Sequence, residues 1–239
     1  MRMKTEEAMA RSRLVGQDGR GTRGTGANGS AIPPSPHPGS NNMAKSADTF
    51  PTLVTRRLRL RQFEPHDAAG LHACFGDQDA MRFWNFPACK TMAETEKTLR
   101  WLSKTTSPYD HLAWAVCKKS HDRCIGMVNY HHRDVRNRRF ELGYIIAPKH
   151  QRKGFAAETV RAVLKYCVDE LDVHRVEALI HPDNVASTRL VEGLGFCCEG
   201  GPLTDYWRVG DRYVSIMIYA FINDGRKWAT RHAPKREMR

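Results

Sequence analysis

The sequence predicts a single domain of the α/β (α+β) class, built on a mixed, mostly antiparallel sheet with about four helices. Three apolar segments follow one another closely, at Leu112–Cys117, Cys124–His132 and Phe140–Ile146. Polar turns join them, which is typical of an antiparallel meander. The clearest helical pattern of the chain, Gly154–Leu171, separates this meander from three further strand patterns. A helix in that position indicates a crossover connection within one sheet.

The first elements are one strand and two helices. Thr55–Arg61 alternates apolar and charged residues, as a half-buried strand does. Pro65 precedes a short apolar pattern, and proline is well tolerated in the first turn of a helix. Thr91–Lys104 places its two leucines on one side, which predicts a second helix.

Gly154–Leu171 is the strongest helix prediction because its apolar residues form one stripe at spacings of three, four and seven. The stripe consists of Ala156, Val160, Val163, Leu164, Cys167 and Leu171. The pattern then predicts a strand at Val176–Ile180 and a short helix over Asn184–Gly193, ended by its glycine. Two more strands, Phe196–Trp207 and Tyr213–Phe221, complete the order β-α-α-β-β-β-α-β-α-β-β.

Composition divides the chain into an N-terminal extension of residues 1–48, a folded domain of residues 49–223 and a basic tail of residues 224–239. Residues 1–42 contain no aromatic residue but seven glycines and four prolines. Such a segment buries too little apolar surface to offset its ordering entropy, so we expect it to be disordered. Met43 stands just before the foldable sequence, which suggests that Met43 is the natural translation start and that residues 1–42 are an overextension of it.

The formal net charge of +12 is concentrated at the two ends of the chain. Residues 1–42 hold six Lys/Arg against three Asp/Glu, a net of +3, and residues 226–239 hold six against one, a net of +5. The ends therefore carry eight of the twelve charges. A broad nucleic-acid surface on the folded part is not required, and we expect at most weak electrostatic contact through the tails.

Composition also bears on the compartment and on metals. No apolar run approaches the about 18 residues of a membrane helix. The N-terminus lacks the apolar stretch of a secretory signal, so we expect a cytoplasmic protein without a membrane partner. The seven cysteines include no Cys-x-x-Cys pair, which predicts reduced, mostly buried thiols and no metal. Cys117 and Cys124 flank a predicted hairpin, which would place them opposite each other.

The segment Gln151-Arg152-Lys153-Gly154-Phe155-Ala156 opens the long helix. A helix N-terminus presents unpaired N–H groups and the positive end of its dipole, which suit a phosphate. Gly154 and Ala156 leave room for a ligand to approach the backbone, and Arg152 and Lys153 add positive charge. The spacing is neither that of a P-loop nor that of a dinucleotide fingerprint. It predicts a diphosphate site, with a basic turn that only begins the helix as the alternative.

The loop matches the Gln/Arg-x-x-Gly-x-Gly/Ala signature, and the chain resembles the GNAT superfamily of N-acetyltransferases from about Leu53 to Phe221. More narrowly, it is similar to the branch that acetylates N-terminal alanine or serine of ribosomal proteins. The residues behind this resemblance are Thr55-x-Arg57-Leu58-x-Leu60-Arg61, Glu141-Leu142-Gly143-Tyr144, Asn184-x-x-Ser187 and Glu192-x-Leu194-Gly195-Phe196.

The resemblance implies a single GNAT-like domain whose sheet opens between the strands near Tyr144 and Val176, with acetyl-CoA as cosubstrate in the opening. The backbone of Ile145 and Ile146 would bind the pantetheine arm, and a backbone N–H near Ile146 would stabilise the thioester oxyanion. The amides of the loop would bind the pyrophosphate. The implied cofactor-binding residues are Ile145, Ile146, Gln151, Arg152, Lys153, Gly154, Phe155, Ala156 and Asn184.

Direct acetyl transfer in such enzymes leaves two proton transfers for side chains, one from the acceptor ammonium and one to the departing thiolate. Many relatives place a tyrosine where this chain has Val191, so the resemblance implies Ser187, one turn earlier, as the donor to the thiolate. The alternative role of Ser187 is that of a first-turn serine capped by Asn184. The two roles are compatible.

Glu141 is favoured as the general base, since its strand leads to the implied cofactor site. The alternative is a carboxylate at the rim, paired with Arg138 or Arg139. Asp205 is a second candidate base because parts of the similar branch carry a glutamate near that position. A relayed water is the third.

The acceptor amine stays open. A protein N-terminus is favoured because Thr91–Lys104 and His131–Arg139 contain few of the carboxylates that a cationic small amine needs. His131 and His132 are candidates to line the substrate mouth. An amino acid, polyamine or aminoglycoside acceptor is the alternative, and a non-catalytic basic binding protein on the same fold is a third possibility. A monomer and a homodimer both fit the sequence.

Overall fold

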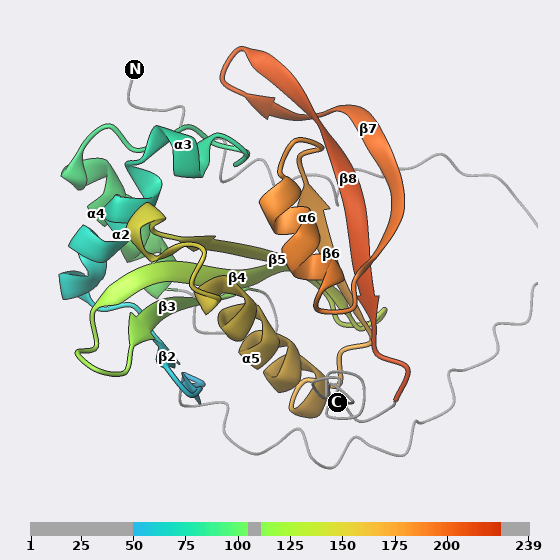
Figure 1. Ribbon diagram of the computed structural model, residues 1–239, viewed down its shortest axis with the longest axis horizontal. Coiled ribbons are helices and arrows are strands. Elements are labelled where there is room, and N and C mark those ends of the chain that lie inside the picture. The colour runs from blue at the N-terminus through green and yellow to red at the C-terminus, as the bar shows by residue number, and fades with distance from the viewer. Residues whose placement is uncertain (1–49, 105–110, 226–239) are drawn as a thin grey trace, which may run out of the picture. The chain divides into compact units, whose positions relative to one another are not determined.

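The chain forms one eight-stranded sheet with helices against both of its faces (Figure 1). The structure, a computed structural model, describes residues 50–104 and 111–225. The predicted extension of residues 1–48 and most of the predicted tail of residues 224–239 lie outside the described residues. The strands are β1 (Leu53–Val54), β2 (Leu58–Arg61), β3 (Leu112–Lys118), β4 (Cys124–Asp134), β5 (Arg139–Ile146), β6 (Arg175–Ile180), β7 (Cys197–Val209) and β8 (Arg212–Ile222). The helices are α2 (Ala68–Phe75), α3 (Gln78–Met81), α4 (Met92–Ser103), α5 (Phe155–Asp169) and α6 (Val185–Glu192), with 3₁₀ turns η2 (Pro65–Asp67) and η3 (Pro148–His150).

The predicted antiparallel meander is confirmed as β3-β4-β5, and β2 and β1 extend it at the β3 edge with the same antiparallel pairing. Cys117 and Cys124 lie opposite each other in the β3–β4 register, as expected, and both thiols are free and buried. The strand predicted at Thr55–Arg61 is shorter than expected. The N–H of Thr55 donates to the carbonyl of Leu58 at 2.9 Å, and this turn separates β1 from β2.

A buried ion pair ties β2 to the helices on one side of the sheet. The guanidinium of Arg61 donates to both carboxylate oxygens of Asp67, at 2.7 and 3.0 Å. It also donates to Asp122, which follows β3, at 3.1 Å. Two parallel bonds to one carboxylate are the strongest arrangement available to arginine. This pairing explains why a charged residue of β2 can lie inside the protein.

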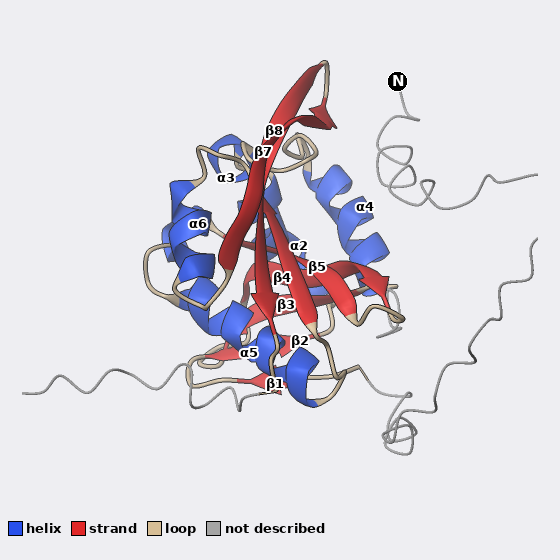
Figure 2. Ribbon diagram, turned by 90° about the vertical axis from the view of Figure 1, so that its right-hand side faces the viewer, coloured by secondary structure: helices blue, strands red, loops and turns tan. Residues whose placement is uncertain are grey.

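The helices form one layer on each face of the sheet (Figure 2). The predicted helix Gly154–Leu171 is confirmed as α5, whose stripe of Val160, Val163, Leu164 and Cys167 is buried against one face. On the other face, α2 and α4 pack through a second apolar cluster that includes Leu71, Leu99 and Leu102. These two layers cover the central strands on both sides, so β3 is almost entirely buried.

Five α-helices occur in the described residues, where the sequence predicts about four. The additional one, α3, has only four residues and begins at Asp77, whose side chain accepts from the N–H of Ala80 at 2.8 Å. A helix of one turn has no periodic apolar pattern, so the sequence gives no sign of it. Among the described residues, no helix is long and apolar enough to cross a membrane.

The second half of the sheet is joined to the meander by α5, which returns the chain so that β6 lies parallel to β5. β8 then pairs with β6 and β7 pairs with β8, so β7 is the outermost strand. The long β7–β8 hairpin extends past the end of β6 (Figure 1). Cys197 and Cys198 on β7 are exposed, so the expectation of buried thiols fails for these two cysteines.

Candidate active site

The sheet opens between β5 and β6. These parallel strands pair only over three residues, and the last pair is Glu141 with Glu177. Beyond it, β5 stays with β4 as far as Ile146, and β6 stays with β8 as far as Ile180. The two strands therefore diverge toward their carboxyl ends. The predicted opening is present, and it begins just after Glu141 and Glu177.

The edge of β5 that faces the opening presents a backbone N–H group to a ligand. The N–H of Ala147 donates to Ile125 at 2.9 Å and so points toward β4. Successive residues of a strand turn their backbone groups to opposite edges, so the N–H of Ile146 points toward the opening. The side chains of Ile145 and Ile146 are buried. Ile146 thus presents backbone rather than side chain to a ligand, whereas Ile145 turns its backbone groups toward β4.

The predicted loop lies at the carboxyl end of β5. Gln151 uses both of its nitrogens internally, because its N–H donates to Pro148 at 3.1 Å and its side chain donates to the carbonyl of Ile146 at 2.8 Å. Arg152 and Gly154 have φ of 57° and 75°, in the left-handed region. Alternation of this kind turns successive N–H groups to one side and creates an anion-binding hollow.

The N-terminus of α5 adds further amide groups to that hollow. The first intrahelical bond runs from Glu158 to the carbonyl of Gly154 at 3.1 Å, which leaves the amides of Phe155 and Ala156 without an intrahelical acceptor. The Phe155 ring is buried, so this residue offers backbone alone. The Lys153 ammonium donates to the carbonyl of Lys149 at 2.8 Å. The loop can therefore bind a diphosphate mainly through its backbone.

Arg57 and Glu158 stabilise the loop through hydrogen bonds and a cation–π contact. Glu158 accepts from Thr55 Oγ1 at 2.6 Å, from the N–H of Arg57 at 2.8 Å and from Arg57 Nε at 2.6 Å. Arg57 Nη1 donates to the carbonyl of Lys153 at 2.9 Å, and the guanidinium lies 4.5 Å from the centre of the Phe155 ring. Sequence reasoning missed Glu158. Its signal is an acidic residue in the first turn of a helix that begins in a basic loop.

Helix α6 brings Ser187 to β5. Asn184 is the N-cap, since its side chain accepts from the N–H of Ser187 at 3.2 Å. The Ser187 hydroxyl lies 2.6 Å from the hydroxyl of Tyr144. Burial raises the pKa of Tyr144 to about 12, against the opposing effect of the Ser187 hydrogen bond. Val191 is fully buried in the core. Tyr144 was not predicted as a site residue, because nothing in the sequence links it to a residue 43 positions away.

Glu141 is bound by two histidines rather than by Arg138 or Arg139. Its carboxylate oxygens lie 3.1 Å from Nε2 of His131 and 3.1 Å from Nδ1 of His132. Burial alone would raise the pKa of Glu141, but the two imidazole hydrogen bonds outweigh it and lower the pKa to about 2. The predicted arginine alternative is wrong. Arg138 pairs with Asp172, and Arg139 pairs with Glu177 and Asp134.

Glu141 and Ser187, two of the predicted site residues, lie on opposite faces of the sheet. Glu141 and Gly143 share one face with their cross-strand partners His131 and Asn129. Tyr144, at the alternate position, packs on the α5 side and meets Ser187 there. Asp205 lies on β7, where its N–H lies 3.3 Å from Ser215 Oγ, and β8 and β6 separate β7 from β5 in the order of the sheet.

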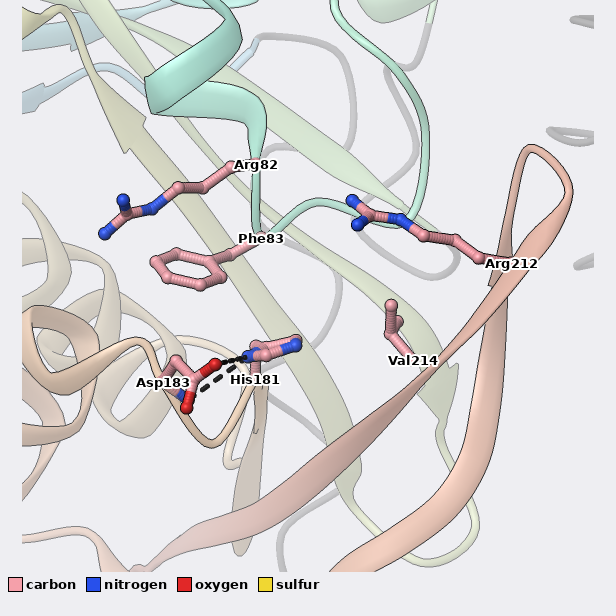
Figure 3. A pocket seen from close by; sticks show the side chains of 6 residues that line it. All are labelled: Arg82, Phe83, His181, Asp183, Arg212 and Val214. Carbon is pink, nitrogen blue, oxygen red and sulfur yellow. Dashed lines mark hydrogen bonds and ion pairs between the residues drawn. The ribbon is translucent and has the colours of Figure 1, made fainter.

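A pocket of about 380 Å³ lies at the carboxyl end of β6 (Figure 3). Arg82 and Phe83 enter it from the segment after α3, and Arg212 and Val214 enter it from β8. His181 and Asp183 form its floor, just before the N-cap of α6. Among the described residues, neither Arg82 nor Arg212 forms an ion pair with a carboxylate. The arginines outnumber the single carboxylate of the pocket, so it favours a ligand with negative charge.

Comparison with known proteins agrees with this geometry. Residues 57–197 match the family model described as "Acetyltransferase (GNAT) domain". The chain is 31% identical to the uncharacterized N-acetyltransferase YoaA of Bacillus subtilis over 151 residues, covering 63% of this chain and 85% of that protein. It is 26% identical to the putative ribosomal N-acetyltransferase YdaF of Bacillus subtilis (75% of this chain, 97% of that protein). It is also 26% identical to the spermidine N(1)-acetyltransferase of Vibrio cholerae (68% and 91%).

A solved structure extends the comparison to the whole fold. A GNAT-family acetyltransferase from Bacillus anthracis superposes with a TM-score of 0.63 at 25% sequence identity, over 72% of this chain and 98% of that one. The matched residues include the diverging strands, the loop that opens α5 and the helix that carries Ser187. The chain belongs to the GNAT family and is an acetyl-CoA-dependent N-acetyltransferase.

Proposed function

We propose that this enzyme acetylates the N-terminal amine of a polypeptide whose first residues carry negative charge. The relatives include both a putative ribosomal N-acetyltransferase and a spermidine acetyltransferase, so similarity alone leaves the acceptor open. The positive charge of the pocket in Figure 3 favours an acidic peptide over a polyamine. Arg82 and Arg212 would repel a polyamine, and they would attract the carboxylates of an acidic peptide.

The opening between β5 and β6 is assigned to acetyl-CoA. The outward N–H of Ile146 would pair with the pantetheine arm, with Ile145 supporting the strand from its other edge. The amides of residues 152–156 would bind the pyrophosphate, while Gln151 holds the loop to β5 and Asn184 holds the first turn of α6. A preformed N–H at the thioester oxygen would stabilise the oxyanion without reorganisation.

The proton for the departing thiolate is assigned to Ser187. Because Tyr144 keeps its proton at neutral pH, it can donate to Ser187 Oγ and leave the serine proton free to point at the sulfur. The pair then acts as a short relay rather than as a single donor. With this pair on the α5 face, the leaving group would lie on the opposite side of the sheet from Glu141.

The proton of the acceptor ammonium is assigned to the pair of Glu141 and His131. A carboxylate with a pKa of about 2 binds a proton weakly, so Glu141 alone is a poor base. It attracts the ammonium instead, and it holds the imidazole of His131 to receive the proton. Glu141 and His131 are favoured over Asp205, which lies on β7, three strands from β5 in the order of the sheet.

The acceptor is tested by measuring acetyl-CoA consumption with three substrates. These are a free-amine peptide beginning Ser-Asp-Glu, the same peptide with lysines in place of the acidic residues, and spermidine. An N-acetylated peptide is the blank. We expect the acidic peptide to have a kcat/KM at least tenfold above that of spermidine. The combined variant Arg82→Ala/Arg212→Ala should raise the KM for that peptide about tenfold. Arg208→Ala, which removes a β7 arginine outside the pocket, should not. A preference for spermidine would overturn the proposal.

A further inference from the structure

Three side chains with metal-binding atoms meet at the end of the β4–β5 ladder. They are His131, His132 and Glu141, and one ligand atom from each lies within 4.8 Å of the others. Each imidazole contacts a different oxygen of the carboxylate at 3.1 Å. The Glu141 side chain is largely buried, with 15% exposure, whereas that of His132 is 51% exposed. The cluster is therefore anchored by the largely buried Glu141 and is open to solvent at His132.

The convergence of two consecutive histidines requires a special backbone. Neighbours along a strand normally point to opposite faces. Here the β4–β5 register shifts between His131 and Asp134, and His132 has a φ of 51°, in the left-handed region. This conformation costs a non-glycine residue about 1 kcal/mol or more, and it turns the second imidazole back to Glu141. Such strain is found where a side-chain arrangement has a use.

Asn129 provides an independent observation. It is 9% exposed, and its Oδ1 accepts no hydrogen bond among the described residues. Its Nδ2 lies 3.4 Å from Nδ1 of His131 and 3.5 Å from Nε2 of His111. Rotating the amide by half a turn would let Oδ1 accept from the Nδ1–H of His131, and the buried oxygen would be satisfied. In the tautomer protonated at Nδ1 alone, the Nε2 lone pair of His131 would face Glu141, and a cation between the two would take the place of the proton that otherwise links them.

We propose that His131, His132 and Glu141 bind a divalent transition metal, with zinc as the best match. Two imidazoles and one carboxylate, with a fourth position open to water, form a common zinc ligand set. Ligands about 2.0–2.1 Å from a tetrahedral zinc lie about 3.3 Å from one another. The carboxylate lies 3.1 Å from each imidazole, and all three ligand atoms lie within 4.8 Å of one another, so only small shifts would bring them around a metal. Asn129 would orient His131 from behind, as a second partner of a metal-bound histidine does.

Zinc at this position would also inhibit acetyl transfer. This consequence, unlike the binding itself, rests on the proposed function, because it follows from the roles of Glu141 and His131 toward the acceptor ammonium. The metal would occupy the electron pairs that those roles need. Sequence reasoning expects no metal, since the three ligands follow no familiar spacing and two of them converge only through the backbone of His132.

Zinc binding is measured by calorimetry on the full chain, with Cys197→Ser and Cys198→Ser in every sample to remove the exposed thiols. We expect one zinc per chain. His132→Ala and Glu141→Gln should each weaken binding at least tenfold, and Asn129→Ala should weaken it about tenfold. His121→Ala, an exposed histidine elsewhere, should bind as the parent does. Circular dichroism verifies that each variant is folded.

Activity gives the second readout. Zinc inhibition of each variant is measured against its own metal-free rate, and His132→Ala should lose inhibition by zinc. Absence of zinc binding in the parent, or equal affinity in the parent and in both His132→Ala and Glu141→Gln, would overturn the metal site. Zinc binding without inhibition would leave the site standing and would contradict the assigned roles of Glu141 and His131.

Discussion

The hydroxyl groups of Tyr144 and Ser187 lie 2.6 Å apart and connect β5 to the first turn of α6. β5 and α6 are far apart in the sequence. The contact between them lies where β5 no longer pairs with β6. Each hydroxyl needs a partner for its second hydrogen-bonding function. A hydrogen-bond acceptor placed beside Ser187 would accept from the serine hydroxyl. A departing thiolate is such an acceptor, and it needs a donor in that position.

Ser187→Ala should lower kcat about tenfold to a hundredfold with little change in the affinity for CoA, because it removes a proton donor and no cofactor contact. Tyr144→Phe should have a smaller effect, since Ser187 remains. The double variant should be no slower than Ser187→Ala, because the two hydroxyls act in series. Steady-state kinetics and CoA calorimetry provide both numbers. A Ser187→Ala enzyme with unchanged kcat would remove the serine from the mechanism.

Gly154→Val should weaken CoA binding at least tenfold. A β-branched residue is strained at a φ of 75°, and its Cβ would lie 3.3 Å from Arg57 Nη2, where the loop amides converge. Gly210→Val is the matched control, because Gly210 has a φ of 63° but no neighbour within 4 Å of an added Cβ. The two variants should lose similar stability in thermal unfolding. If both then bind CoA equally well in calorimetry, the loop is not the pyrophosphate site.

Much of this fold is encoded locally, which is why the sequence predicts it. The stripe of α5 and the alternation in the meander depend on spacing alone. Position-specific contacts depend on the assembled fold. Thr55 and Arg57 meet Glu158 from about a hundred residues away, and no local pattern records that distance.

The candidate site divides in the same way. The loop around Gly154 is predictable because helix starts and glycines have a local signature. The histidine environment of Glu141 is not, because it depends on the left-handed φ of His132. A sequence gives no sign that a histidine will adopt that conformation. The nearby arginines are the partners that sequence proximity suggests, and the structure pairs them elsewhere.

Asp67→Ala should lower the free energy of unfolding by about 3 kcal/mol or more. It would leave the buried Arg61 guanidinium without its bidentate partner. The more exposed carboxylates of Asp122 and Glu64 would remain, but removing one partner of a buried ion pair is costly. The control is Asp169→Ala, which removes the exposed ion pair with Lys165 on α5 and should cost less than about 0.5 kcal/mol. Urea unfolding monitored by tryptophan fluorescence measures both. Equal losses of unfolding free energy would mean that the buried ion pair stabilises the protein no more than the exposed pair does.

Glu158→Gln should destabilise the protein near neutral pH and much less in acid. Burial would raise the pKa of Glu158, but hydrogen bonds from Thr55 and Arg57 and the attraction of the guanidinium lower it below its ordinary value of 4.5. A carboxyl with a depressed folded pKa stabilises the native state above its unfolded pKa, and this contribution is lost as the pH falls through the folded value. The difference between Glu158→Gln and the parent in urea unfolding should therefore be constant above about pH 6 and shrink below the unfolded pKa. The exposed Glu170→Gln, just past the end of the same helix, should show no such trend. A difference that persists undiminished in acid would mean that the amide disturbs packing and that the ionised carboxylate is not what holds β2 to the loop.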